Sequence, residues 1–225
     1  LGTISTRFSE KDQPRAWSLV GPYGSGKSSF ALFLSHLLST PESKKARAAR
    51  KLLAGNDTEL AETLRIETKD TDGYLEVLIS GTPERLSLRY LRGLQDGMAG
   101  YWLGRKGKKP AVIADMDRYA AAGEVSVSEL IELTKSCQGA LSKVGCPGMI
   151  IVFDEFGKFL EYESRFLGVN DVFLLQALAE HAHAAHSTKI LLLVLLHQSI
   201  EQYARGVGES LKNEWAKIQG RFEEI

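Results

Sequence analysis

The chain has 225 residues with 28 basic and 28 acidic side chains, so its formal net charge at pH 7 is zero. This balance excludes a global field that would draw it to nucleic acid or an anionic membrane. The longest apolar run, 190–196, is far too short to span a bilayer, which takes about 20 residues. The two cysteines, Cys137 and Cys146, form no C-x-x-C pattern and indicate a reducing, cytoplasmic setting.

The first residue is not methionine and no signal-peptide pattern follows it. We therefore expect the chain to be one part of a larger protein. Its length and 44% hydrophobic content suffice for one large domain with a substantial core.

The clearest motif, G-x-x-x-x-G-K-[S/T], is a phosphate-binding loop at residues 21–28. The apolar run 16–20 predicts a strand that enters the loop. Helical periodicity continues beyond it to Leu38, and Thr40-Pro41 ends the predicted helix. A strand, loop and helix in this order are the context that the motif requires.

The residue types of the loop fit phosphate chemistry. Its glycines allow backbone N–H groups to point at phosphate oxygens, and the helix N-terminus adds its dipole. Lys27 can reach the β and γ phosphates, and the Ser28 hydroxyl can bind Mg²⁺. We expect the nucleotide to contact Gly21, Pro22, Tyr23, Gly24, Ser25, Gly26, Lys27, Ser28 and Ser29.

Residues from about 40 to 147 form a mostly helical insertion. Apolar periodicity predicts helices at 86–103, 111–121 and 126–144, and the run 74–79 predicts a strand. Two basic stretches, 44–51 and 105–109, leave nucleic acid open as a partner. A solvated helix face and an ordinary loop are the alternatives.

The second decisive element is the apolar run 149–153, which ends in Asp154 and Glu155. A continuous apolar strand is typical of a central parallel strand, and ligands bind at the carboxyl ends of such strands. Asp154 is expected to hold Mg²⁺ beside Ser28. Glu155 is expected to polarise a water for attack on the γ-phosphate.

The apolar run 190–196 predicts a neighbouring strand and ends in His197 and Gln198. Either side chain can contact the γ-phosphate or the attacking water; a plain polar strand end is the alternative. Before this strand, Asn170 or Asp171 is expected to cap a helix. The helix carries His181, His183 and His186, for which we expect a polar face rather than a metal site.

The C-terminal part predicts a helix over 208–219, followed by Arg221. Arg221 either interacts with the helix dipole or is donated to the nucleotide of a neighbouring subunit. Residues 222–225 are expected to begin one more strand.

These segments resemble the additional-strand catalytic-Glu class of P-loop ATPases, and within it the AAA+ superfamily. The resemblance rests on residues 21–28, 151–156, 197–199 and 219–223, which look like Walker A, Walker B, sensor-1 and arginine-finger segments. The Asp-Glu-Phe sequence is similar to the initiator-like and signal-transduction (STAND) branches. The C-terminal tail also resembles ATPase regions of large bacterial proteins of antiviral (anti-phage) defence.

The resemblance implies a three-layer αβα fold with a parallel sheet in 5-1-4-3-2 order, ATP and Mg²⁺ as ligands, and action as a homo-oligomer or a switch. It makes Lys27 and Glu155 catalytic, His197 or Gln198 the sensor, and Arg221 a finger acting in trans. Two features depart from the family. The interval from Lys27 to Asp154 is longer than in a compact AAA+ core, and the helical lid and last strand are expected beyond the C-terminus.

We therefore expect a Mg²⁺-dependent ATPase domain that works with other domains of its parent chain. The alternative is a nucleotide-gated oligomerisation scaffold with slow or incidental hydrolysis. A P-loop kinase is disfavoured because Glu155 suits water activation. GTP-binding and ABC-type signatures, Asn-Lys-x-Asp and Leu-Ser-Gly-Gly, do not occur.

Overall fold

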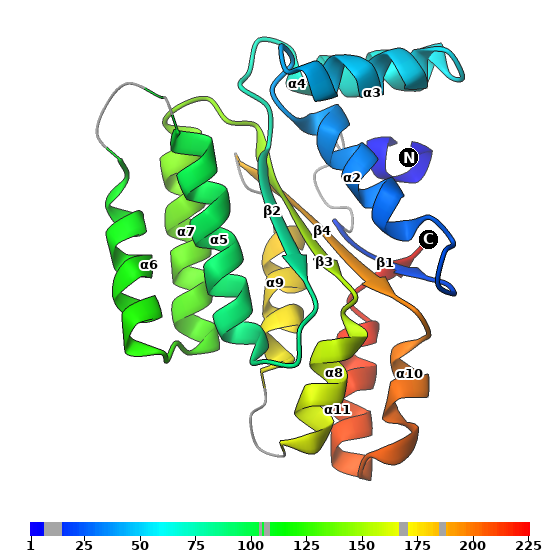
Figure 1. Ribbon diagram of the computed structural model, residues 1–225, viewed down its shortest axis with the longest axis vertical. Helices are drawn as coiled ribbons and strands as arrows, with labels where there is room; N and C mark the ends of the chain where they lie inside the picture. The colour runs from blue at the N-terminus through cyan, green and yellow to red at the C-terminus, as the bar shows by residue number, and fades with distance from the viewer. Residues whose placement is uncertain (7–14, 104, 106–108, 167–170, 185–187) are drawn as a thin grey trace.

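A five-stranded parallel sheet lies at the centre of the computed structural model, which describes residues 1–6, 15–103, 105, 109–166, 171–184 and 188–225 (Figure 1). The strand order across the sheet is β2-β3-β4-β1-β5. The strands are β1 (Ala16–Val20), β2 (Leu75–Ser80), β3 (Gly148–Asp154), β4 (Lys189–Leu196) and β5 (Glu223–Glu224).

The two central strands, β3 and β4, are apolar along almost their whole length because helices cover both of their faces. Their carboxyl ends meet those of their neighbours at one edge of the sheet. In the register, Ser80 of β2 lies opposite Asp154 of β3, and Val20 of β1 lies opposite Leu196 of β4. The segments that follow β1, β3 and β4 therefore share this edge.

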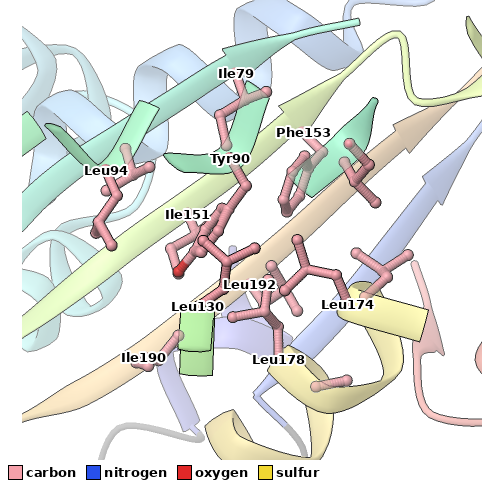
Figure 2. Close-up of a cluster of buried hydrophobic side chains, with 14 of the residues drawn as sticks. Ile79, Tyr90, Leu94, Leu130, Ile151, Phe153, Leu174, Leu178, Ile190 and Leu192 are labelled. Carbon is pink, nitrogen blue, oxygen red and sulfur yellow. The ribbon is translucent and has the colours of Figure 1, made fainter. Parts of the chain in front are cut away.

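One face of the sheet is covered by α5, α7 and α9, with α6 packed outside on α5 and α7 (Figure 1). Figure 2 shows the contact: Tyr90 and Leu94 of α5, Leu130 of α7, and Leu174 and Leu178 of α9 pack among the apolar side chains of the strands. The helices span α5 (Leu86–Trp102), α6 (Ala111–Ala122), α7 (Val127–Ser142) and α9 (Phe173–His183).

The opposite face is covered by α2, against which α3 and α4 pack, with α1 beside α4. A third group of helices follows the carboxyl edge and leads back to β5 (Figure 1). The remaining helices are α1 (Gly2–Thr6), α2 (Lys27–Leu38), α3 (Lys44–Ala54), α4 (Thr58–Thr68), α8 (Gly157–Arg165), α10 (Ile200–Tyr203), the 3-10 turn η1 (Ala204–Gly206) and α11 (Glu209–Gln219).

The predicted α/β class and parallel sheet are confirmed, and the helices expected at 86–103, 111–121 and 126–144 appear as α5, α6 and α7. The described residues between 40 and 147 contribute one strand, β2, and otherwise helices and their connections. The strand expected to begin at 222–225 is β5, which pairs with β1. No helix in the described part of the chain is long and apolar enough to cross a membrane.

The predicted helix cap at Asp171 is wrong. The α9 helix starts at Phe173 with Val172 as its N-cap, and no side chain caps it. Asp171 is buried instead and accepts hydrogen bonds from Ser87 Oγ (2.9 Å) and from Arg85 Nε (3.2 Å). A buried carboxylate requires such partners, and the arginine supplies the opposite charge. Asn170, the other proposed cap, lies outside the described residues.

Candidate functional site

The loop between β1 and α2 has the backbone geometry of an anion cradle. Gly24 and Gly26 adopt left-handed conformations, with φ of +77° and +89°, which L side chains rarely occupy. Gly26 is the N-cap of α2, and no side chain caps the helix. The first N–H groups of α2 therefore face an open site at the positive end of the helix dipole.

Lys27 lies inside this loop. Its ammonium donates to the carbonyl oxygens of Gly21 (2.6 Å) and Pro22 (2.9 Å) and to Ser25 Oγ (3.2 Å). These are neutral acceptors, and an anion adds a Coulomb attraction to the ammonium that they lack. An anion in the loop therefore competes well for this ammonium.

Asp154 and Glu155 follow at the end of β3, on a backbone that is held from both sides. Gly81 N–H donates to the Asp154 carbonyl (2.8 Å), and Phe156 N–H donates to the Leu195 carbonyl (3.0 Å). Glu155 has a positive φ of +51°, which is uncommon for a residue with a side chain. Such conformations persist where the surroundings fix them, and they cluster at functional sites.

Gly81 shows how tightly this backbone is held. A Cβ atom at Gly81 would lie 2.2 Å from the carbonyl oxygen of Glu155. Real Cβ atoms do not approach backbone that closely, so only glycine fits at the carboxyl end of β2.

The Glu155 carboxylate is bound by a lysine from the helix that follows it. Lys158, in the first turn of α8, places its Nζ 2.5 Å from Glu155 Oε2. This hydrogen bond, followed by the nearby negative charge, raises the pKa of Lys158. Both side chains are partly exposed, 44% for Lys158 and 35% for Glu155.

His197, at the end of β4, lies beside the loop because Gly21 N–H bonds to the carbonyl of the preceding residue, Leu196 (3.1 Å). The Tyr23 ring stacks on the His197 ring at a centroid distance of 3.5 Å. Both ring nitrogens of His197 are shielded from solvent and have no hydrogen-bond partner in the described structure. Buried polar atoms are rarely left unpaired, so the N–H of this ring suits a ligand oxygen as its acceptor.

These groups line one pocket of about 270 Å³, formed by Tyr23, Gly24, Ser25, Gly26, Lys27, Ser28, Ser29, Asp154, Glu155 and His197. It unites the expected loop residues with the expected carboxylates. Gln198, the alternative sensor, is exposed and does not line the pocket. Cavities of about 460 and 590 Å³ lie elsewhere, beside α5 and between α6 and α7, but neither is lined by the loop between β1 and α2.

The residues present fit a magnesium ion that also binds nucleotide phosphates. Ser28 and Asp154 bring a hydroxyl and a carboxylate oxygen to the same pocket. Mg²⁺ prefers oxygen ligands and takes only one or two carboxylates together with phosphates and waters. Within the described ranges no group of three or more His, Cys, Asp or Glu gathers as an all-protein metal site.

The histidines of α9 take part in hydrogen bonds. His181 Nε2 lies 2.6 Å from Gln138 Oε1, and His183 accepts from the backbone N–H of Arg15 through Nδ1 (3.1 Å). These contacts give His181 and His183 hydrogen-bond partners within the chain. His186 lies outside the described residues.

Arg221 is not brought to the pocket of its own chain. It forms an ion pair with Glu180 of α9 at 3.0 Å. It stands just before β5, whose Glu223 is in register with Trp17 near the start of β1. The start of a parallel strand and the loop that follows it lie at opposite edges of the sheet.

In each of the two basic stretches, 44–51 and 105–109, one arginine is bound by groups of the same chain and is not available to a nucleic acid. Arg50 is half-buried and donates to Leu37 O (3.0 Å) and Thr68 Oγ1 (2.8 Å), so it holds the end of α2 and does not face a partner. Burial lowers the pKa of Arg50. Arg105 pairs with Asp72 at 2.7 Å. Residues 106–108 of the second stretch lie outside the described residues. In the first stretch, the exposed cations of α3 are Lys44, Lys45, Arg47 and Lys51.

Two contacts in the pocket are not among the features predicted from the sequence: the Glu155–Lys158 ion pair and the stacking of Tyr23 on His197. Glu155 and Lys158 have a spacing of three, which is a readable signal for an ion pair. The contact between Tyr23 and His197 joins residues from the loop and from β4 and depends on the strand order.

Comparison with family models, with curated proteins and with solved structures finds no match for this chain.

Proposed function

We propose that this chain is an AAA+-like P-loop ATPase domain that binds and hydrolyses Mg²⁺·ATP. One observation carries the proposal: a single pocket joins the glycine-rich loop and Lys27 to Asp154, Glu155 and His197. Each of these groups has a distinct task in phosphoryl transfer to water, and chance does not often collect them around an open helix N-terminus.

The roles follow from the chemistry of each side chain. The loop N–H groups and Lys27 bind the phosphate oxygens and stabilise their charge. Ser28 and Asp154 would hold Mg²⁺, which neutralises charge on the phosphates when it is bound. Glu155 takes the proton of the attacking water, and His197 contacts the γ-phosphate or that water.

The topology supports this proposal. Read from β5, the strand order is 5-1-4-3-2, which is the order that the AAA+ resemblance implies. In the sheet, β4 lies between β1, which would be the Walker A strand, and β3, which would be the Walker B strand. With this order His197, at the end of β4, lies between the ends of β1 and β3, which supports the sensor role proposed for it.

The proposal extends to assembly. We propose that the domain acts in a homo-oligomer within a larger cytoplasmic protein, in which Arg221 reaches the nucleotide of a neighbouring subunit. The distance of Arg221 from its own pocket supports a role in trans. Its ion pair with Glu180 has to open for that role.

A second function, a nucleotide-gated scaffold with slow hydrolysis, is favoured by one specific observation. The candidate base Glu155 is engaged by Lys158. A carboxylate so engaged has one oxygen less available to a water. ATP then acts mainly by binding, and assembly persists when hydrolysis is blocked.

Equilibrium binding of Mg²⁺·ATP tests the proposal. The wild-type chain, Lys27→Ala and Asp154→Ala are titrated with a fluorescent ATP analogue with and without Mg²⁺. We expect Mg²⁺-dependent binding that Lys27→Ala weakens at least tenfold and that Asp154→Ala makes independent of Mg²⁺. Wild-type protein that does not bind the analogue, or variants that bind as wild type, would contradict the proposal.

Hydrolysis with and without DNA or RNA then distinguishes what the ATPase acts on. Strong stimulation by nucleic acid indicates a motor or sensor that contacts it, with Lys44, Lys45, Arg47 and Lys51 as the next residues to change. A slow rate of ATP hydrolysis that DNA and RNA do not change, together with ATP-dependent assembly, favours the nucleotide-gated scaffold.

A further inference from the structure

The ion pair between Lys158 and Glu155 carries an inference that rests on the proposed function. The backbone around Glu155 is held on both sides, because Gly81 N–H donates to the Asp154 carbonyl and Phe156 N–H donates to the Leu195 carbonyl. The Glu155 side chain is 35% exposed and is less confined than this backbone. What holds that side chain therefore decides where the carboxylate points.

Lys158 is that partner. Its Nζ lies 2.5 Å from Glu155 Oε2 and makes no other hydrogen bond within the described structure. It lines a separate cavity of about 450 Å³ with Pro83 and Tyr162, whereas Glu155 lines the phosphate pocket. The pair thus draws the carboxylate toward the side of the pocket where Lys158 stands.

Helix stability does not account for a lysine at this position. Lys158 is the second residue of α8, where the helix dipole is positive and a cation is unfavourable. Glu155, just before the helix, already supplies the favourable negative charge. A lysine at position 158 therefore opposes the helix dipole, and the interaction that offsets this cost is its ion pair with Glu155.

We propose that Lys158 is a positioning residue for Glu155: its ammonium holds the carboxylate in a resting arrangement, and opening of the ion pair frees the base for hydrolysis. The pair is partly exposed, and pairs of this kind open readily. The fraction of time that it is open sets the fraction of molecules able to activate water.

The strength of such a pair fixes the expected effect. Exposed ion pairs shift an equilibrium by up to about fivefold. Lys158→Met should therefore raise the single-turnover rate of ATP hydrolysis by up to about fivefold and leave the binding of Mg²⁺·ATP unchanged. Lys158→Arg, which keeps the charge, should retain the wild-type rate.

A matched control tests whether the effect is local. Lys135 forms the same kind of pair with Glu132, three residues away on α7, at 2.6 Å. Lys135→Met should leave the rate unchanged. In a Glu155→Gln background, Lys158→Met should no longer alter the residual rate, because the carboxylate it releases is gone.

The outcomes separate this inference from the proposed function. If the wild type and Lys135→Met bind and hydrolyse ATP but Lys158→Met is unchanged or slower, the proposed function stands and the role of Lys158 is refuted. A drop of tenfold or more would instead make Lys158 a charge that stabilises the transition state. If the wild type itself fails to bind ATP, both proposals fall.

Discussion

Glu163 offers a test of the structure that does not depend on nucleotide. It lies on α8, is 5% exposed, and its Oε2 accepts a hydrogen bond from the backbone N–H of Val172 at the start of α9 (3.0 Å). Burial, and to a smaller extent the charge of Asp171, raises the pKa of Glu163 from 4.5 to about 7. A single hydrogen bond does not offset the loss of water around the ionised group.

The sign follows from proton binding. Because the pKa of Glu163 is higher in the folded protein, its contribution to stability is fully present below pH 4.5 and is lost as the pH rises to about 7. This difference in pKa corresponds to about 3 kcal/mol at pH 8. Glu163→Gln keeps an acceptor for the Val172 N–H and removes the charge.

Urea unfolding followed by circular dichroism at pH 5 and pH 8 measures the effect. We expect Glu163→Gln to be more stable than wild type by about 3 kcal/mol at pH 8 and by less than about 1 kcal/mol at pH 5. Glu161→Gln, an exposed change on the same helix, should stay within about 0.5 kcal/mol of wild type at both values. A Glu163→Gln effect that is equal at the two pH values would refute the reasoning.

Three further changes probe the pocket and its support. Gly81→Ala drives a Cβ into the Glu155 carbonyl and should slow ATP hydrolysis at least tenfold while a fluorescent ATP analogue still binds; normal hydrolysis would contradict the tight fit. His197→Ala should lower the maximal rate at least tenfold with little change in ATP affinity, and an unchanged rate argues against a sensor role. Arg50→Met should cost about 1–3 kcal/mol in urea unfolding because it leaves buried carbonyl groups unpaired, whereas Lys51→Met on the exposed face of α3 should cost under about 0.5 kcal/mol; equal losses would contradict the role given to Arg50.

The elements that could be predicted are those whose signal lies within a short window. The helix α5 shows its apolar stripe over four turns, and β3 and β4 are continuous apolar runs, so their existence and approximate bounds follow from the sequence. The glycine-rich loop 21–28 and the Asp154-Glu155 pair are local motifs as well. The pocket that joins them follows from their common position after parallel strands.

The features that could not be predicted from the sequence depend on contacts between distant segments or on weak local signals. The helix α8 has only nine residues, and its many charged side chains conceal its apolar face. The sequence predicts a helix cap at Asp171 because it shows only the neighbouring residues, whereas its partner Arg85 is 86 residues away in the chain. Arg50 looks like a surface cation until the end of α2 is folded against it.

The most direct test of the central claim is the hydrolysis of Mg²⁺·ATP by the full chain and by Glu155→Gln, with phosphate release and ATP binding measured on the same samples. A general base contributes roughly 10²–10⁴-fold to a rate. The account predicts that the variant binds Mg²⁺·ATP with wild-type affinity and releases phosphate at least a hundredfold more slowly. Equal phosphate release by the two proteins would contradict the assignment of Glu155 as the base and, with it, the ATPase mechanism proposed for this pocket.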